Sequence, residues 1–458
     1  MKEFIGRTDE MRLLEKSYSG NSNLILLTGR RRIGKTRLIK EFLKGKDAIY
    51  FLATNVNESA MLDEFGKCIQ NALGTVFGSP RDWSEAFSAV VKDAERRVLV
   101  LDEFSYMIRM SDGFLVRFQG LYDEILKDSG VLTILCGSHR TIMERLSDDY
   151  NSPLYGRFDR RITLKPLDFY QIPSTGDICT DIERYSVHGG IPRYMEVLGD
   201  GDLPQAVRED VMDPSSMMFE DPLIILESDA GLSNMYLSIT KAIGRGNHRL
   251  SEIASALEVG AGNLPPYLVI LTESGFIRKE IPITENNPEN SKKGKYVLND
   301  HFTEFWFRFV YPFRPQLAFG DTTYAMSVFE KDFVQKHVGF VFEDICGSFI
   351  RKHPERLGFL PEKIGKYWDR NTEVDIVVLN TSEKRAFVGE CKYKRNNAVD
   401  RHVLNELRAK VSRIKELEDY DVTFGLFSVS GFDDGLDGDD VLLFGPEDLI
   451  SKARIVQE

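Results

Sequence analysis

The first third of the chain alternates short apolar runs with segments of helical periodicity. Residues 22–29, 97–104 and 131–138 (SNLILLTG, RVLVLDEF and VLTILCGS) are apolar runs that predict buried strands. Residues 33–44 and 114–130 carry apolar side chains at helical spacing. Because strands that alternate with helices form parallel sheets, an α/β domain is expected here.

The middle of the chain changes character twice. Residues 178–230 are mostly helical in pattern, with a break at the sequence GGIP. Residues 235–298 give two short helices and then two strands that flank the polar loop TENNPENSKKG, which is the element order of a winged helix-turn-helix. Residues 301–330 are aromatic and contain prolines, which predicts a packed connector.

The last 130 or so residues read as a second α/β domain, with a helix at 338–352 and another near 400–418. Strands are expected at 364–370, 373–380, 385–394, 421–428 and 440–445. The expected domains are an α/β core (1–177), a helical lid (178–230), the winged helix-turn-helix (231–300), the connector (301–330) and the carboxyl-terminal domain (331–458).

Composition narrows the class of protein. The 458 residues are 42% apolar and 28% charged, as in an ordinary globular protein, and the net charge of −12 argues against a polybasic nucleic-acid binder. The five cysteines form no CxxC pair, so a zinc ribbon is not indicated. We find no apolar signal core at the amino terminus and no apolar stretch of about 18 residues, so we expect a cytoplasmic protein with reduced thiols and no membrane span.

Residues 29–36, GRRRIGKT, match the phosphate-loop pattern GxxxxGK[ST] between a predicted strand and a predicted helix. Gly29 and Gly34 let backbone N–H groups close around a β-phosphate at a helix N-terminus, whose dipole favours anions. Lys35 would reach the β- and γ-phosphates, and the Thr36 hydroxyl would hold Mg²⁺. A chance glycine turn is the alternative, but it does not account for the strand-loop-helix context. ATP and Mg²⁺ are therefore the expected cofactors.

The second predicted strand ends in two acids that complement this loop. Asp102 would join the Mg²⁺ shell, and Glu103 would polarise the attacking water. Many strands end in a solvated Asp-Glu pair, so this signal is weak alone and gains weight only after a matched phosphate loop.

The motifs FIGR with Glu10, GRRRIGKT, VLVLDEF, LCGSHR and PLYGRF occur in this order over residues 1–230. Together they resemble the archaeal-type AAA+ ATPases, relatives of the STAND signalling ATPases. The resemblance implies that Phe4 and Ile5 line an adenine pocket and that Ser138 senses the γ-phosphate. An ordinary strand-end hydroxyl is the alternative for Ser138.

The same resemblance points to two arginines. Arg157 would be an arginine finger that stabilises charge on the transferred phosphoryl group of a neighbouring subunit, which implies a homo-oligomer. Arg160 and Arg161 compete for this role, and a structural salt bridge is an open alternative for Arg157. Arg193 in GGIPRY would be a nucleotide-sensing arginine of the lid, with a plain surface arginine as the alternative.

The winged-helix segment has a mixed signal for DNA binding. Residues 235–298 hold eight Lys or Arg against six Asp or Glu, a local charge of +2. The expected recognition helix carries almost no basic residue, although Arg, Lys, Asn and Gln are the usual readers of base edges. Only Asn263 and the wing lysines 292, 293 and 295 are available, so a winged helix used for protein packing stays open.

The carboxyl-terminal domain carries a candidate metal site. Asp375 opens one predicted strand, and Glu390 and Lys392 share one face of the next, while Cys391 points to the other face. Two close carboxylates and a lysine are the groups that metal-assisted phosphodiester hydrolysis needs. This pattern, preceded by Glu343 on a helix, resembles the PD-(D/E)xK nucleases, which implies a restriction-endonuclease-like fold of the DUF234 type. Val374 stands where that family usually has proline.

These features support one leading hypothesis and two alternatives. The leading one is an ATP-hydrolysing protein with a DNA-contacting tail that resembles a Mg²⁺-dependent nuclease. The first alternative is a STAND-like signalling ATPase whose winged helix and tail bind proteins and do not cut DNA. The second is an inactive regulator that binds ATP without turnover, and the presence of Asp102, Glu103 and Ser138 counts against it.

Overall fold

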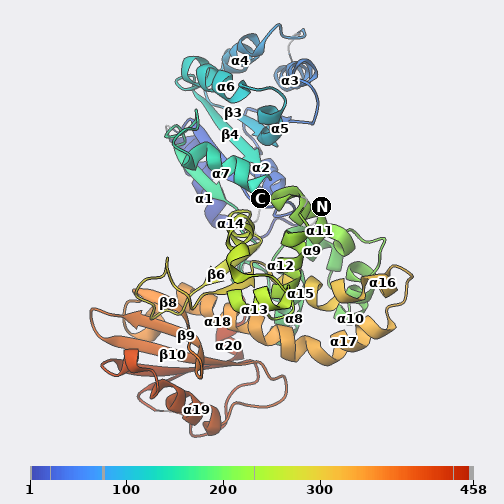
Figure 1. The fold of residues 1–458 in the computed structure, drawn as a ribbon. Helices are drawn as coiled ribbons and strands as arrows, with labels where there is room; N and C mark the ends of the chain where they lie inside the picture. Colours follow the sequence, from blue (N-terminus) through green and yellow to red (C-terminus); the bar gives the residue numbers. More distant parts are fainter. Residues whose placement is uncertain (1–2, 21, 75–77, 232, 437, 453–458) are drawn as a thin grey trace. The chain divides into compact units, whose positions relative to one another are not determined.

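The computed structural model describes residues 3–20, 22–74, 78–231, 233–436 and 438–452. The chain divides into two compact units (Figure 1). The N-terminal unit holds the described residues up to Pro166 together with Ile191–Arg193, and the C-terminal unit holds Leu167–Gly190 and the described residues from Tyr194 onward.

The N-terminal unit is built on a five-stranded parallel sheet of order β2-β3-β4-β1-β5. Every residue of β1, β3 and β4 is buried, because helices cover both faces of a parallel sheet of this kind. The three strands expected from the sequence are confirmed. Two further strands were not predicted: β2, whose five residues are all apolar, and β5, whose sequence RRIT contains a single apolar residue. The strands are β1 (Leu24–Thr28), β2 (Ala48–Leu52), β3 (Arg97–Asp102), β4 (Val131–Gly137) and β5 (Arg160–Thr163).

Seven α-helices accompany this sheet in the described residues of the unit. An aromatic cluster of Phe65, Trp83, Phe87, Phe114 and Phe118 fills the core beside β2 and β3. The helix expected at 114–130 is shorter, since α6 passes into a π-helical turn at Tyr122–Leu126. The helices are α1 (Thr8–Ser19), α2 (Lys35–Phe42), α3 (Glu58–Leu73), α4 (Trp83–Val91), α5 (Phe104–Arg109), α6 (Phe114–Leu121) and α7 (Arg140–Asp148).

The C-terminal unit begins with helices and one antiparallel hairpin, β6–β7. The segment expected to be a connector, 301–330, is largely helical and is packed through Phe305, Phe309, Phe329 and Phe333 around His337. The elements are α8 (Ile178–His188), α9 (Pro192–Leu198), α10 (Leu203–Ala206), α11 (Met217–Ala230), α12 (Asn234–Gly244), α13 (Leu250–Ala256), α14 (Pro265–Glu273), β6 (Ile277–Glu280), β7 (Lys295–Leu298), α15 (His301–Phe309), α16 (Arg314–Leu317) and α17 (Thr323–Phe333).

A mixed five-stranded sheet of order β12-β11-β10-β9-β8 completes the C-terminal unit (orange to red in Figure 1). Strands β8, β9 and β10 are antiparallel neighbours, and β10, β11 and β12 are parallel. The elements are α18 (Gly339–Lys352), β8 (Lys363–Trp368), β9 (Glu373–Asn380), β10 (Arg385–Lys392), α19 (Arg401–Val411), β11 (Asp421–Ser428), β12 (Val441–Phe444) and α20 (Pro446–Leu449).

The two long helices of this part cover opposite faces of the mixed sheet. Leu404 and Leu407 of α19 share a hydrophobic core with Val388 of β10. Phe349 of α18 packs on Phe444, which also contacts Phe387, the residue before Val388. Side chains alternate along a strand, so α18 and α19 lie on different faces. Among the described residues, every helix is too short or too polar to cross a membrane.

Candidate functional site

The phosphate loop, residues 29–36, joins the buried strand β1 to α2. Gly34 is the N-cap of α2 with φ 96°, and Gly29 has φ 152°. A Cβ on Gly29 would stand 2.9 Å from the Leu164 carbonyl oxygen, so glycine is required. The buried Lys35 Nζ donates to the carbonyl oxygens of Gly29 at 2.7 Å and Arg30 at 3.0 Å, which holds the ammonium group inside the loop.

Asp102, at the carboxyl end of β3, is brought together with Thr36 as expected. Its Oδ2 accepts hydrogen bonds from Thr36 Oγ1 at 3.1 Å and from the Tyr50 hydroxyl at 2.6 Å. The sequence did not reveal Tyr50, because its contact depends on β2 lying beside β3. Burial, followed by the Asp102 contact, raises the pKa of Tyr50, so this hydroxyl stays a donor. Hydroxyl and carboxylate oxygens are the ligands that Mg²⁺ prefers, so this donor set fits the ion.

Glu103 and Ser138 also meet, at the carboxyl ends of the neighbouring strands β3 and β4. Ser138 Oγ lies 2.8 Å from each carboxylate oxygen of Glu103 and donates to it. The Ser138 N–H lies 3.3 Å from Glu103 Oε2. Glu103 itself adopts a left-handed conformation, φ 53°, which is unusual for a residue with a side chain and is typical of functional sites. The expected sensor therefore fixes the expected water-polarising acid.

The amino-terminal motif is tied to the phosphate loop through Arg7. The Arg7 guanidinium donates to the carbonyl oxygens of Ile33 at 2.9 Å and Lys165 at 2.7 Å, and its side chain is only 4% exposed. Phe4 is buried and Ile5 partly exposed. The sequence identified Arg7 only as part of a motif, whereas the structure shows that it holds the loop backbone.

Arg157 lies near the amino ends of the parallel strands, whereas the phosphate loop lies at their carboxyl ends. Two residues later, Asp159 accepts a hydrogen bond from the N–H of Leu24, the first residue of β1. The loop follows the other end of β1, about 15 Å away along the strand. Arg157 forms a two-pronged ion pair with Asp123, with Nη2 2.8 Å from Oδ2. The structure therefore does not bring Arg157 to the phosphate loop of its own chain.

The other candidate arginines differ in position. Arg161 pairs with Asp148, and Arg160 lies beside it in β5. Arg193 is exposed and follows Pro192, whose Cγ would lie 3.6 Å from a Cβ built on Gly34. Of the arginines expected at the nucleotide, Arg193 is therefore the one that lies next to the phosphate loop within the N-terminal unit.

In the C-terminal sheet, the register puts Asp375 opposite Glu390. Ile376 pairs with Gly389 in the antiparallel ladder of β9 and β10, and continuing that register by one residue on each strand pairs the two acids. Asp375 Oδ2 also accepts the Cys391 N–H at 2.8 Å. Cys391 is buried on the opposite face, where its thiol interacts with Cys346 of α18. The two acids are therefore cross-strand neighbours.

The negative charge of Glu343 on α18 affects the ionisation of Asp375. Burial, together with the negative charges of Glu343 and Glu390, raises the pKa of Asp375 to about 8. Glu343 is itself held by Lys366 of β8, with Nζ 2.8 Å from Oε2, and burial raises its pKa. The negative charges of Glu343 and Glu390 thus both act on Asp375, Glu343 from α18 and Glu390 from the neighbouring strand.

Two lysines hold the Glu390 carboxylate. Lys392 Nζ lies 2.7 Å from Oε1, as its place on the same strand face predicts. Lys410 of α19, which the sequence did not single out, lies 2.9 Å from both carboxylate oxygens. Within the described parts of the chain, no group of three or more His, Cys, Asp or Glu side chains is arranged to hold a metal ion. The oxygen donors suit Mg²⁺, but Lys410 already occupies both oxygens of Glu390.

The hairpin β6–β7 and its loop are attached to the mixed sheet. The Ile283 N–H donates to the Lys366 carbonyl oxygen at 2.9 Å, and Trp368 Nε1 donates to the Lys293 carbonyl oxygen at 3.0 Å. Lys295 Nζ pairs with Glu373 at 2.8 Å. Of the three wing lysines, Lys295 is thus engaged by an acid of β9.

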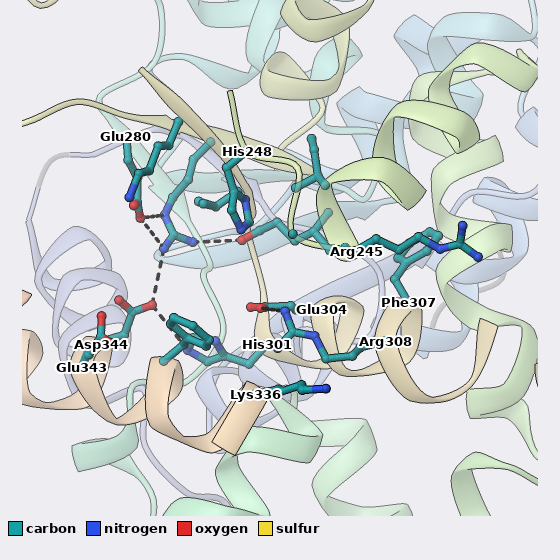
Figure 2. Close-up of a pocket in the computed structure, with 18 of the residues that line it drawn as sticks. Arg245, His248, Glu280, His301, Glu304, Phe307, Arg308, Lys336, Glu343 and Asp344 are labelled. Carbon is teal, nitrogen blue, oxygen red and sulfur yellow. Dashed lines mark hydrogen bonds and ion pairs between the residues drawn. The ribbon is translucent and has the colours of Figure 1, made fainter. Parts of the chain in front are cut away.

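A cavity of about 630 Å³ adjoins these contacts within the C-terminal unit (Figure 2). Figure 2 shows Glu280, Glu343 and Asp344 at one end and Arg245 and Arg308 towards the other. Most of these charges have protein partners: Asp344, for example, pairs with both Arg278 and Lys366. Burial opposes ionisation, but Lys366 and Arg278 hold the pKa of Asp344 at about 2. The network fastens the hairpin to α18 and β8.

Four exposed residues of α14, the expected recognition helix, are apolar. Val269 is 53% exposed and Ile270 is 39% exposed, and Pro265 and Pro266 are exposed at the helix start. No Lys or Arg lies between Pro265 and Glu273. The helix therefore offers no Arg, Lys, Asn or Gln to base edges.

The parallel sheet, the phosphate loop and the Thr36–Asp102 contact define a P-loop nucleoside-triphosphatase. Residues 4–198 match the family described as "ATPase domain predominantly from Archaea", and residues 306–404 match DUF234, "Archaea bacterial proteins of unknown function". The chain is 31% identical over 455 residues to "Uncharacterized protein MJECL04" of Methanocaldococcus jannaschii, covering 97% of this chain and 99% of that protein. It therefore belongs to this family of archaeal ATPases with a DUF234 tail.

Two further similarities concern the ATPase part. "Uncharacterized ATP-binding protein MJ0423" of M. jannaschii is 52% identical over 44 residues, 9% of this chain and 75% of that protein. The solved Walker-type ATPase PABY2304 of Pyrococcus abyssi superposes with a TM-score of 0.51 at 23% identity, covering 66% of this chain and 95% of that chain. The second similarity establishes the fold.

Proposed function

We propose that this protein is a Mg²⁺-dependent ATPase whose nucleotide cycle controls a DNA-cleaving tail. The paired contacts at the carboxyl edge of the parallel sheet, Thr36 to Asp102 and Ser138 to Glu103, carry the ATPase part of this proposal. Four side chains from α2, β3 and the ends of β3 and β4 converge there, next to the ammonium group of Lys35.

Each side chain has a distinct task in hydrolysis. Lys35 binds the β- and γ-phosphates, Phe4 and Ile5 contact the adenine, and Arg193 senses the nucleotide beside Gly34. Glu103 accepts a hydrogen bond from the attacking water and orients it, and Ser138 holds the Glu103 carboxylate in place. Thr36 and Asp102 would hold Mg²⁺, which neutralises negative charge on the phosphates when bound.

Arg157 acts on a neighbouring subunit in this proposal. Its position near the amino ends of the strands separates it from the phosphate loop of its own chain. It can therefore contact only the nucleotide of a neighbouring subunit. The Asp123 ion pair holds the guanidinium until a neighbour offers a phosphoryl group. A homo-oligomer is therefore the proposed active form.

For the tail, we propose that Asp375 and Glu390 bind a divalent cation and that Lys392 contacts the scissile phosphate of DNA. The cross-strand register of the two acids supports this site, and the charge of Glu343 on α18 acts on Asp375. The hairpin β6–β7 belongs to a winged helix-turn-helix over residues 231–300, and the exposed Lys292 and Lys293 of its loop would contact DNA phosphates without reading sequence.

A nuclease assay with the purified protein tests the tail. Supercoiled, linear and single-stranded DNA are incubated with Mg²⁺ or Mn²⁺, with and without ATP. Glu390→Gln and Lys392→Ala should abolish cleavage, whereas Cys391→Ser should retain it because Cys391 lies on the other sheet face. Lys35→Ala should change regulation by ATP but leave the metal chemistry competent. If no DNA form is cut under any of these conditions, the tail is not a nuclease.

The exposed apolar residues of α14 favour a second function, a STAND-like signalling ATPase that binds proteins through its winged helix. Pro265, Val269 and Ile270 would then contact a protein surface in place of DNA. ATPase rates measured with and without DNA distinguish the two functions. Stimulation by DNA supports the first, and no response to any DNA form supports the second.

A further inference from the structure

The Glu390 carboxylate is held by two ammonium groups that come from different elements. Lys392 of β10 contacts Oε1 alone, at 2.7 Å. Lys410 of α19 contacts Oε1 and Oε2, both at 2.9 Å. The Glu390 side chain is only 7% exposed, whereas each lysine side chain is about one-third exposed. A buried acid is therefore balanced by two positive charges that reach it from the solvent side.

The two lysines are not equivalent. An ammonium group at equal distance from both oxygens lies in the plane that bisects the carboxylate, and a divalent cation bound by both oxygens would lie in the same plane. Lys392 leaves Oε2 accessible to a second cation, but Lys410 does not. Two cations that compete for the same oxygens also repel each other. Lys410 and a metal ion therefore exclude each other at Glu390.

Lys410 can leave without a change of fold. It lies in the last turn of α19, and Val403, Leu404 and Leu407 anchor that helix to the sheet through the hydrophobic core. The ammonium group is carried by a flexible four-carbon stem that is 32% exposed, so the side chain can swing into solvent while the helix stays in place. Only the cation that contacts the Glu390 carboxylate then changes.

We propose that Lys410 is an internal counter-ion that takes the place of the metal at Glu390, so that the tail site binds a divalent cation only when Lys410 is displaced. This inference rests on the proposed function of Asp375 and Glu390 as metal ligands. It adds the regulation of that site: the metal affinity of the resting protein is low because a lysine of the same chain already neutralises the ligand.

Direct metal binding tests the proposal without reference to cleavage. Mn²⁺ is titrated into the full-length protein, and free Mn²⁺ is measured from its electron paramagnetic resonance signal. All variants carry Lys35→Ala, which removes nucleotide from the phosphate loop. Lys410→Met should bind Mn²⁺ at least about tenfold more tightly than the parent, because a charged hydrogen-bond partner of the ligand is lost. Adding Glu390→Gln to Lys410→Met should abolish that gain.

Two controls keep the result specific. Lys415→Met removes an exposed lysine from the same domain and should leave Mn²⁺ affinity unchanged. Lys410→Gln keeps a hydrogen-bond donor for Glu390 but removes the charge, so it tests the same proposal if Lys410→Met fails to fold. Circular dichroism melting of each variant shows that the domain is folded.

The outcomes separate the two proposals. If the parent and both Lys410 variants bind Mn²⁺ equally and Glu390→Gln abolishes binding, the metal site stands and the role of Lys410 is wrong. If the Lys410 variants gain affinity that Glu390→Gln does not remove, the ion binds elsewhere and the role of Lys410 is again wrong. If none of the folded variants binds Mn²⁺, the metal site itself fails, and the inference fails with it.

Discussion

Replacing Tyr50 by phenylalanine tests whether Asp102 is positioned for Mg²⁺. The change removes one hydroxyl, which donates to Asp102 Oδ2 at 2.6 Å. A hydrogen bond to a charged group contributes about 1.5–3 kcal/mol, and 1.4 kcal/mol corresponds to a tenfold change in an equilibrium constant. Tyr50 is partly exposed, so water replaces part of the bond, and Asp102 keeps its contact with the Glu103 N–H at 2.9 Å. We therefore expect a loss near the lower end of this energy range. It corresponds to about a tenfold increase in the Mg²⁺ concentration that gives the half-maximal ATPase rate.

The assay is the steady-state ATPase rate at fixed ATP over a range of Mg²⁺ concentrations. Nucleotide binding without Mg²⁺ should not change, because Tyr50 is not expected to touch the phosphates. Tyr18→Phe is the matched control, since its hydroxyl donates to the Arg96 carbonyl oxygen at the amino end of β3, away from Asp102. A folded Tyr50→Phe variant with the Mg²⁺ dependence of the parent would show that Tyr50 does not position Asp102 for the ion.

The remaining predictions concern the nucleotide site, the trans finger and pH. Lys35→Ala should abolish ATP binding, whereas Glu103→Gln should bind ATP and lose turnover. Equilibrium binding of a fluorescent ATP analogue and phosphate release measure these two effects. Unchanged binding by Lys35→Ala would refute the phosphate-loop assignment. ATPase rate per molecule should rise with protein concentration, and Arg157→Ala should lower turnover about tenfold or more; a concentration-independent rate with an unaffected variant excludes a trans finger. Burial lowers the pKa of His337 from 6.5 to about 4, so the unfolded chain takes up the proton first as the pH falls. The free energy of unfolding should therefore decrease between about pH 6.5 and pH 4, by up to about 1.4 kcal/mol per pH unit from this group. In urea titrations His337→Gln should reduce this dependence and the exposed His402→Gln should not; equal slopes for all three proteins contradict the reasoning.

Local patterns determined much of this protein. Three apolar runs predicted the three central strands, because a strand buried on both faces shows its burial as a continuous run. The phosphate loop was readable because its backbone conformation needs glycines at fixed spacing, next to Lys35 and Thr36. The alternation of side chains along a strand placed Glu390 and Lys392 together and Cys391 apart from them, for a reason that is local to one strand.

Tertiary structure decided what each candidate touches. Tyr50 reaches Asp102 because β2 lies beside β3, and Lys410 reaches Glu390 because α19 packs on the same face of β10. Arg7 holds the phosphate loop from a segment 26 residues earlier. These partners lie far apart in the chain, and no local periodicity records them; they follow from strand order and helix packing. The sequence could thus select the acids of both candidate sites, but only the folded chain shows that a lysine of its own already holds one of them.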